Sequence, residues 1–167
     1  MHETPAEIAA LQKLLDDSYA RGGEHLKGIH SEARRVTAAR LCELLVKVCI
    51  LDVATVSSRG EPRVAPLDGL FFRGRFIIGS SPKSLRARHL RRNPAVSAAH
   101  TRGEELTVLA HGTAVDIDTS DPREAPLHDY CREVYGPSYD EWGYWGKAPF
   151  WRIEPKLMFA AAFKDLG

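Results

Sequence analysis

From Cys49 onward, the sequence alternates between short apolar, β-branched runs and polar turns that contain glycine. The clearest turns contain Gly60, Gly74 and Gly103. Six or seven short strands joined by hairpin turns are typical of an antiparallel β-barrel. Because proline cannot donate a hydrogen bond to a neighbouring strand, we expect Pro66 at a bulge or a sheet edge. The expected strands are 50–57, 63–72, 76–79, 95–100, 106–117, 150–153 and 157–163, the last two on either side of Glu154-Pro155.

The region before the barrel reads as a helical arm. Thr4 followed by Pro5 is a typical helix start, and Gly22-Gly23 is expected to end the helix. A polar linker is expected to follow as far as Val36. The predicted organisation is therefore an N-terminal helical arm and linker over 1–36, then a barrel domain over 37–167.

Further helices are expected at 38–46, at 85–92 after the cap Ser81-Pro82, and from Asp121 to about Val134. Residues 135–151 are rich in glycine and aromatic side chains, and no element is assigned there. Such a cluster is more typical of a core or a dimer interface than of a ligand wall, and both interpretations stay open.

Composition excludes several classes of protein. The chain has 167 residues, 44% of them hydrophobic and 27% charged, which suits one globular domain and not a disordered or fibrous chain. A net charge of +1 gives no general attraction to nucleic acid or anionic membrane. Three cysteines without a Cys-x-x-Cys pair, and histidines without metal-ligand spacing, argue against disulfides and metal sites. With no leader or spanning segment expected, we predict a cytoplasmic protein.

The richest candidate site is the stretch 79–94, where a strand leads two serines to the start of a basic helix. Free backbone N–H groups and the helix dipole favour an anion at such a start. Two alternatives stay open: a solvated basic helix with an ordinary cap, or a nucleic-acid-binding helix. The candidate phosphate-binding residues are Ser80, Ser81, Lys83, Ser84 and Arg86.

Several short motifs occur in an order that resembles the pyridoxamine 5'-phosphate oxidase-like family of flavin (FMN)-binding split β-barrels. They are Ala54-Thr55-Val56, Gly60-Glu61-Pro62-Arg63-Val64-Ala65-Pro66-Leu67, Gly79-Ser80, Ser84-Leu85-Arg86-Ala87-Arg88-His89-Leu90, Asn93-Pro94-Ala95-Val96-Ser97 and Trp151-Arg152-Ile153-Glu154-Pro155. The resemblance implies a mainly β, α+β fold: a six-stranded antiparallel split β-barrel with flanking helices. It also implies a homodimer that holds FMN, or alternatively a deazaflavin coenzyme, at the subunit interface.

The resemblance assigns roles by position. Ser80 and Ser81 would start the phosphate loop, and Ser84 and Arg86 would occupy the family's Ser-x-Lys position, with arginine in place of lysine. Lys83 would add a further phosphate contact. The strand Arg63-Val64-Ala65-Pro66 would run beside the isoalloxazine ring.

The resemblance does not extend to vitamin synthesis. The oxidases that make the vitamin carry an aromatic-rich Glu-Phe-Trp strand and end with an Arg-x-His tail that grips the substrate, whereas here the corresponding strand segment reads Met158-Phe159-Ala160-Ala161-Ala162-Phe163 and this sequence has no such tail. The sequence therefore predicts a flavin-dependent oxidoreductase that acts on a small organic substrate, with no catalytic residue identified. The alternatives are a non-catalytic flavin- or haem-binding protein on the same scaffold and, less favoured, a nucleic-acid binder.

Overall fold

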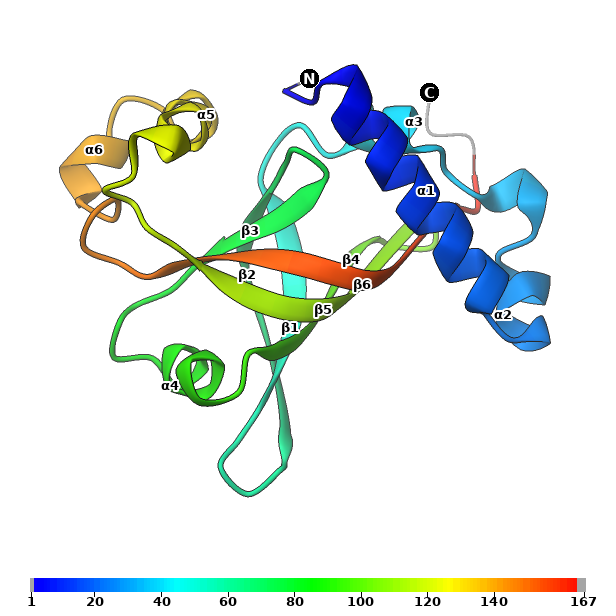
Figure 1. The fold of residues 1–167 in the computed structure, drawn as a ribbon, viewed down its shortest axis with the longest axis horizontal. Helices are drawn as coiled ribbons and strands as arrows, with labels where there is room; N and C mark the ends of the chain where they lie inside the picture. The colour runs from blue at the N-terminus through cyan, green and yellow to red at the C-terminus, as the bar shows by residue number, and fades with distance from the viewer. Residues whose placement is uncertain (1, 165–167) are drawn as a thin grey trace.

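A computed structural model describes residues 2–164. Met1 of the predicted arm and residues 165–167 of the predicted barrel domain therefore lie outside the described residues. Six strands close into an antiparallel barrel in the order β1–β2–β3–β6–β5–β4 (Figure 1). The predicted six-stranded antiparallel barrel with flanking helices is confirmed. The strands are β1 (Cys49–Val56), β2 (Pro62–Phe72), β3 (Arg75–Gly79), β4 (Ala95–Arg102), β5 (Leu106–Ile117) and β6 (Phe150–Ala162).

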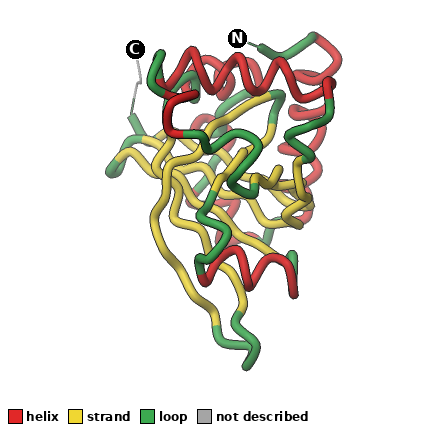
Figure 2. Tube along the Cα trace, turned by 90° about the vertical axis from the view of Figure 1, so that its left-hand side faces the viewer, coloured by secondary structure: helices red, strands yellow, loops and turns green. Residues whose placement is uncertain are grey.

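The β1–β2 hairpin extends beyond the barrel as a long arm, at the bottom of Figure 2. β2 pairs with β1 from Pro62 to Gly69 but with β3 only from Gly69 to Phe72. The outer half of β2, residues 62–68, therefore has a second edge without a strand partner in the described chain. Pro66 lies on this half, at an edge as expected, and the pairing with β1 continues past it without a bulge.

β6 corrects one prediction, because the two strands expected around Glu154-Pro155 are one continuous strand. The pairing with β5 shifts by one residue at Gly112, which leaves Lys156 as the extra residue of a β-bulge. A Cβ on Gly112 would lie 2.0 Å from the Glu154 carbonyl oxygen. Glycine at 112 therefore allows the close backbone approach that keeps the proline within the strand.

Helix α1 (Pro5–Arg21) lies across the barrel and covers β6 (Figure 1). Its Leu11 and Leu15 belong to the barrel core. The Ser18 hydroxyl accepts a hydrogen bond from Met158 N at 2.9 Å, and the Tyr19 hydroxyl donates to Ala160 O at 2.8 Å. The arm is thus fastened to the barrel by both apolar and polar contacts.

The polar linker expected after α1 is wrong in part, because it contains helix α2 (Glu24–Ile29) and the 3-10 helix η1 (Glu32–Arg34). The side chain of Leu26 in α2 packs against Gly22 at the end of α1. A Cβ added to Gly22 would lie 3.1 Å from this side chain. His30, which caps α2, is buried with Nδ1 3.2 Å from the Tyr19 hydroxyl. Tertiary contacts with α1 therefore hold a short helix that weak apolar periodicity does not predict.

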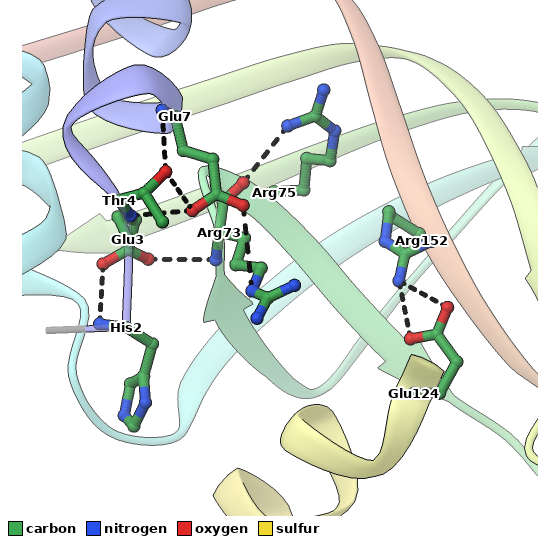
Figure 3. Close-up of polar contacts among 8 residues, drawn as sticks. All are labelled: His2, Glu3, Thr4, Glu7, Arg73, Arg75, Glu124 and Arg152. Atoms are coloured by element: carbon green, nitrogen blue, oxygen red, sulfur yellow. Dashed lines mark hydrogen bonds and ion pairs between the residues drawn. The ribbon is translucent and has the colours of Figure 1, made fainter. Parts of the chain in front are cut away.

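The start of α1 is tied to the β2–β3 turn (Figure 3). Thr4 and Glu7 form a reciprocal capping box, in which Thr4 N donates to the Glu7 carboxylate at 2.7 Å. The backbone N–H of Arg73 donates to the Glu3 carboxylate at 3.0 Å. The predicted helix start is confirmed, and it also docks the arm.

The other helices flank the barrel: α3 (Ala38–Leu44), α4 (Leu85–Arg92), α5 (Ala125–Tyr135) and α6 (Tyr139–Trp142). Asp121 begins a short 3-10 helix, η2 (Pro122–Glu124), before α5. Glu124 accepts two hydrogen bonds from Arg152 of β6, at 3.0 and 2.8 Å, instead of completing a cap (Figure 3). This ion pair fastens the start of α5 to the barrel.

Two apolar clusters stabilise the fold. One fills the barrel and reaches under α1 and α3, and Trp151 is fully buried in it. The other joins Leu70 and Phe72 of β2 to Leu127 and Tyr130 of α5. All three cysteines are buried free thiols. Within residues 2–164, no helix combines the length and apolar character needed to cross a bilayer.

Candidate functional site

A cavity of about 720 Å³ lies between the loop that follows β3 and the aromatic segment that follows α5. One wall is polar and contains Ser80, Ser81 and Arg86. Leu67 and Asp68 of β2 also line the cavity. The aromatic residues of the lining are Tyr135, Tyr139, Trp142, Tyr144 and Phe150, and they are called the aromatic wall below.

The polar wall is organised around the N-terminus of α4. Ser84 is the N-cap, since its hydroxyl accepts a hydrogen bond from Ala87 N at 3.0 Å. The Ser84 and Ser80 hydroxyls lie 2.8 Å apart, and Arg86 Nη1 lies 3.5 Å from the Ser80 hydroxyl. The loop and the helix therefore present a connected set of donors to the cavity.

Arg86 carries the only cationic side chain among the described residues that line this cavity. It is half-buried, and burial lowers its pKa. No carboxylate between residues 2 and 164 forms an ion pair with it. A buried charge is normally paired, so this guanidinium is well suited to a ligand anion.

The aromatic wall supplies flat apolar surface. Tyr135 and Tyr139 are stacked, with ring centroids 5.5 Å apart and an interplanar angle of 12°. Trp142 and Tyr144 are 53% and 51% exposed although they line the cavity. Burial raises the pKa of both Tyr135 and Tyr139, so these phenols stay neutral. Such a surface can stack on a planar ring system.

The aromatic segment, residues 135–151, contains both core residues and residues that line the cavity. Tyr139, Phe150 and Trp151 are buried in the two apolar clusters, as core residues. Tyr135, Tyr139, Trp142 and Tyr144 line the cavity. The segment is therefore part core and part cavity wall, a division that depends on how α5 and α6 turn over the barrel.

The structure places the predicted phosphate residues in three positions. Ser80, Ser81 and Arg86 line the cavity, and Ser84 reaches it through Ser80. Lys83 is exposed on the turn before α4.

The predicted ring-side strand lies beside the cavity and not within its lining. Arg63, Val64, Ala65 and Pro66 are exposed on the outer half of β2, where Arg63 pairs with Glu61 at 2.7 Å. The next two residues along the strand, Leu67 and Asp68, do line the cavity. Sequence reasoning missed this pair, although strand alternation places Asp68 on the same side of β2 as Pro66.

The histidines near the barrel make hydrogen bonds within the protein. His89 Nδ1 lies 2.9 Å from the Thr55 hydroxyl, and His111 Nδ1 lies 2.8 Å from the Ser97 hydroxyl. In the described part of the chain, no three His, Cys, Asp or Glu side chains gather as a metal site would require.

No protein-family model matches the chain, and no curated protein matches it either. Solved structures do match. A conserved hypothetical protein from Mycobacterium tuberculosis has a TM-score of 0.65 at 19% identity, over 83% of this chain and 96% of its own. The haem storage protein HutZ from Vibrio cholerae has a TM-score of 0.63 at 18% identity, over 74% and 93%. An FAD-binding protein from Mesorhizobium loti has a TM-score of 0.59 at 20% identity, over 77% and 94%.

The chain has the split-barrel fold of the pyridoxamine 5'-phosphate oxidase-like proteins. An F420 reductase shares this split barrel, with a TM-score of 0.55 at 19% identity, over 70% of this chain and 94% of its own. The chain spans 52% of a longer matched protein of unknown function from Agrobacterium tumefaciens. At these identities the comparisons establish the fold alone.

Proposed function

We propose that this split-barrel protein is a flavin-dependent oxidoreductase acting on a small organic substrate, with the phosphate of FMN held by Arg86, Ser80 and Ser81. The observation that carries the proposal is the half-buried Arg86, which has no carboxylate partner in the described chain and sits among serine hydroxyls. Phosphate needs convergent donors and a countercharge, and charge-assisted hydrogen bonds are the strong ones. The N-terminus of α4 adds a favourable dipole at the same place.

The cavity also fits the rest of such a cofactor. Its volume of about 720 Å³ falls within the usual range for ligand sites. Trp142 and Tyr144, which are about half exposed, offer flat aromatic surface in the same cavity as the phosphate donors. When bound, the flavin would supply the hydride or electron chemistry, whereas the chain would bind and orient it. A deazaflavin coenzyme, which also carries phosphate and a planar ring, is the alternative cofactor.

We further propose that the protein forms a homodimer and that the cofactor lies where the two copies meet. Val64, Ile50 and Leu85 are 68%, 55% and 62% exposed, which leaves apolar side chains of β2, β1 and α4 without cover. In a homodimer these side chains would form part of one contiguous apolar interface. The exposed strand Arg63–Pro66 would then gain its contacts with the ring system in the dimer.

A non-catalytic flavin- or haem-binding protein is the second candidate, and a haem storage protein shares the fold. Haem iron needs an axial ligand from the protein, and His, Cys, Met or Tyr can supply it. The described residues that line the cavity include no His, Cys or Met, but they include Tyr135, Tyr139 and Tyr144. A haem in this cavity would therefore have only tyrosine oxygens as axial ligands, which makes it the second candidate.

A nucleic-acid-binding role for α4 has less support. Arg92 donates to the backbone carbonyls of Ser57 and Ser58, and Arg91 donates to the carbonyl of Pro82. These two basic groups therefore help to hold the β1–β2 hairpin and the loop before α4, which leaves fewer cations to form a phosphate-binding stripe.

The test begins with the purified full-length protein, mixed separately with FMN, a deazaflavin coenzyme and haem. We expect quenching of FMN or deazaflavin fluorescence at one site per chain, and reduction of the bound flavin by a nicotinamide or dithionite donor. Reoxidation by a small organic acceptor would distinguish the enzyme from the flavin-binding alternative. Haem binding without flavin binding would contradict the proposal.

A further inference from the structure

A second cavity, of about 390 Å³, lies at the junction of three elements: the end of α3, the start of β1 and the end of β4. Lys47, Cys49, His100 and Arg102 line it. It shares no lining residue with the cavity beside α4. The proposed flavin site therefore does not account for its side chains.

His100 is the unusual group in this cavity. Its side chain is buried, with 8% of the residue exposed. Nδ1 lies 2.9 Å from the carbonyl oxygen of Ile50, so Nδ1 carries a proton and donates it. Nε2 is buried and has no hydrogen-bond partner among the described residues. A buried polar atom without a partner is costly, so a ligand atom at Nε2 would relieve that cost once the side chains that cover this nitrogen shift.

The charges around His100 are mainly positive. Arg102 donates a hydrogen bond to the Leu44 carbonyl and forms no ion pair within residues 2–164. The Lys47 ammonium likewise makes no contact with a carboxylate in the described chain. The one carboxylate of the lining, Glu43, is 3.0 Å from Arg40. Two cations thus face the cavity without a countercharge.

The thiol in the cavity does not supply that countercharge. Cys49 Sγ donates to the Lys47 carbonyl at 3.4 Å. Burial raises the pKa of this thiol to about 11, so it stays neutral at physiological pH. The cavity therefore lacks an anion of its own to balance Lys47 and Arg102.

We propose that this cavity is a second ligand site, which binds a small oxyanion between Lys47, Arg102 and Nε2 of His100. Phosphate and carboxylate share the chemistry that the two cations recognise. They differ at Nε2, because hydrogen phosphate carries an O–H that can donate to the unprotonated nitrogen. A carboxylate ion has no such proton and would need His100 to be doubly protonated.

The test is an NMR titration of the full-length protein with inorganic phosphate and, separately, with acetate, following the ring nitrogens of His100. The Arg86→Ala variant is used as the background so that an ion at the α4 site cannot produce the signal. We expect saturable movement of the Nε2 resonance with phosphate, and weaker binding of acetate. Acetate binding more tightly than phosphate would assign the site to carboxylates. Movement with neither probe would overturn the proposal.

Two variants separate a site from general electrostatics. Lys47→Ala should weaken phosphate binding about three- to tenfold, the effect of a partly exposed charge-assisted hydrogen bond. Lys164→Ala removes the same charge from an exposed position outside the cavity and should leave binding unchanged. Equal weakening by both variants would contradict the proposal.

His100→Asn tests the nitrogen itself. Asparagine can still donate to the Ile50 carbonyl from the position of Nδ1, but it has no atom at the position of Nε2. Phosphate binding should then fall although the variant keeps its fold, as measured by thermal unfolding. Unchanged affinity in the folded variant would remove His100 from the site.

Discussion

The Arg86 guanidinium, in the first turn of α4, lies 3.5 Å from the Ser80 hydroxyl in the loop before that helix. The contact joins Arg86, which has no carboxylate partner in the described chain, to the loop after β3, which contributes Ser80 to the proposed phosphate site. It also gives the site a direct test.

Replacing Arg86 with alanine should weaken FMN binding roughly ten- to a hundredfold, because a charge-assisted hydrogen bond contributes about 1.5–3 kcal/mol. The measurement is a fluorescence titration of the apo-protein. Arg88→Ala is the matched control, since Arg88 is exposed on the same helix and does not line the cavity. Similar losses in both variants would mean that the helix attracts anions without a defined site.

Ser84→Ala should lower both stability and cofactor affinity. Loss of the α4 cap should reduce the free energy of unfolding by about 1 kcal/mol in urea denaturation. FMN affinity should fall by less than about tenfold, because Ser84 acts through the Ser80 hydroxyl and a neutral hydrogen bond contributes little. Ser84→Thr keeps a hydroxyl cap and should recover most of the stability. Equal stability of Ser84→Ala and the parent protein would contradict the capping role.

Gly112→Ala should destabilise the barrel strongly. The new Cβ would lie 2.0 Å from the Glu154 carbonyl oxygen and 2.8 Å from Pro155 Cα, and neither backbone atom can move without disturbing the bulge. We expect a loss of at least about 3 kcal/mol, at the upper end for overpacking. Gly28→Ala is the control, since a Cβ there meets nothing within 4 Å and alanine favours helix α2. A Gly112→Ala variant as stable as the parent would disprove the close approach.

Stability should fall on acidification through His30. Burial, followed by the charges of Arg34 and Arg35, holds the pKa of this histidine below its ordinary value of 6.5. The unfolded chain therefore binds a proton at a higher pH than the folded one, so the unfolding free energy decreases as the pH drops below about 6.5. In urea denaturation between about pH 8 and pH 5, His30→Asn should show a shallower decrease than the parent. A decrease as steep in His30→Asn as in the parent protein would contradict this role of His30.

The sequence predicts the barrel well because strand alternation and hairpin glycines are local signals. The continuous β6 is not predictable in that way, since Glu154-Pro155 resembles a strand break when it is considered alone. It stays within the strand because Gly112, more than forty residues earlier, leaves room for the bulge. Such a compensation appears only after β5 and β6 are paired.

In the candidate site, too, local contacts could be predicted from the sequence and long-range contacts could not. Ser80, Ser81 and Arg86 lie within one strand–turn–helix unit, so their proximity follows from sequence spacing. The aromatic wall comes from a segment about sixty residues later, whose position depends on the Glu124–Arg152 ion pair and on burial of α5. No local pattern specifies that Trp142 and Tyr144 line the same cavity as the loop after β3.

The free edge of β2 limits how two copies of the chain can associate. Pairing with β1 continues through Pro62 and Pro66, so the nitrogen atoms of these prolines must face the outer edge, where no ladder bond is lost. Pro62 and Pro66 are an even number of residues apart, so their nitrogens point to the same edge of β2. Every second residue that would offer a backbone N–H at this edge is therefore a proline, and another strand cannot form a continuous ladder of hydrogen bonds there. Aggregation through a continuous intermolecular sheet is thereby disfavoured at the most exposed strand of the molecule. An association that uses this arm must rely on side chains such as Val64, meeting face to face.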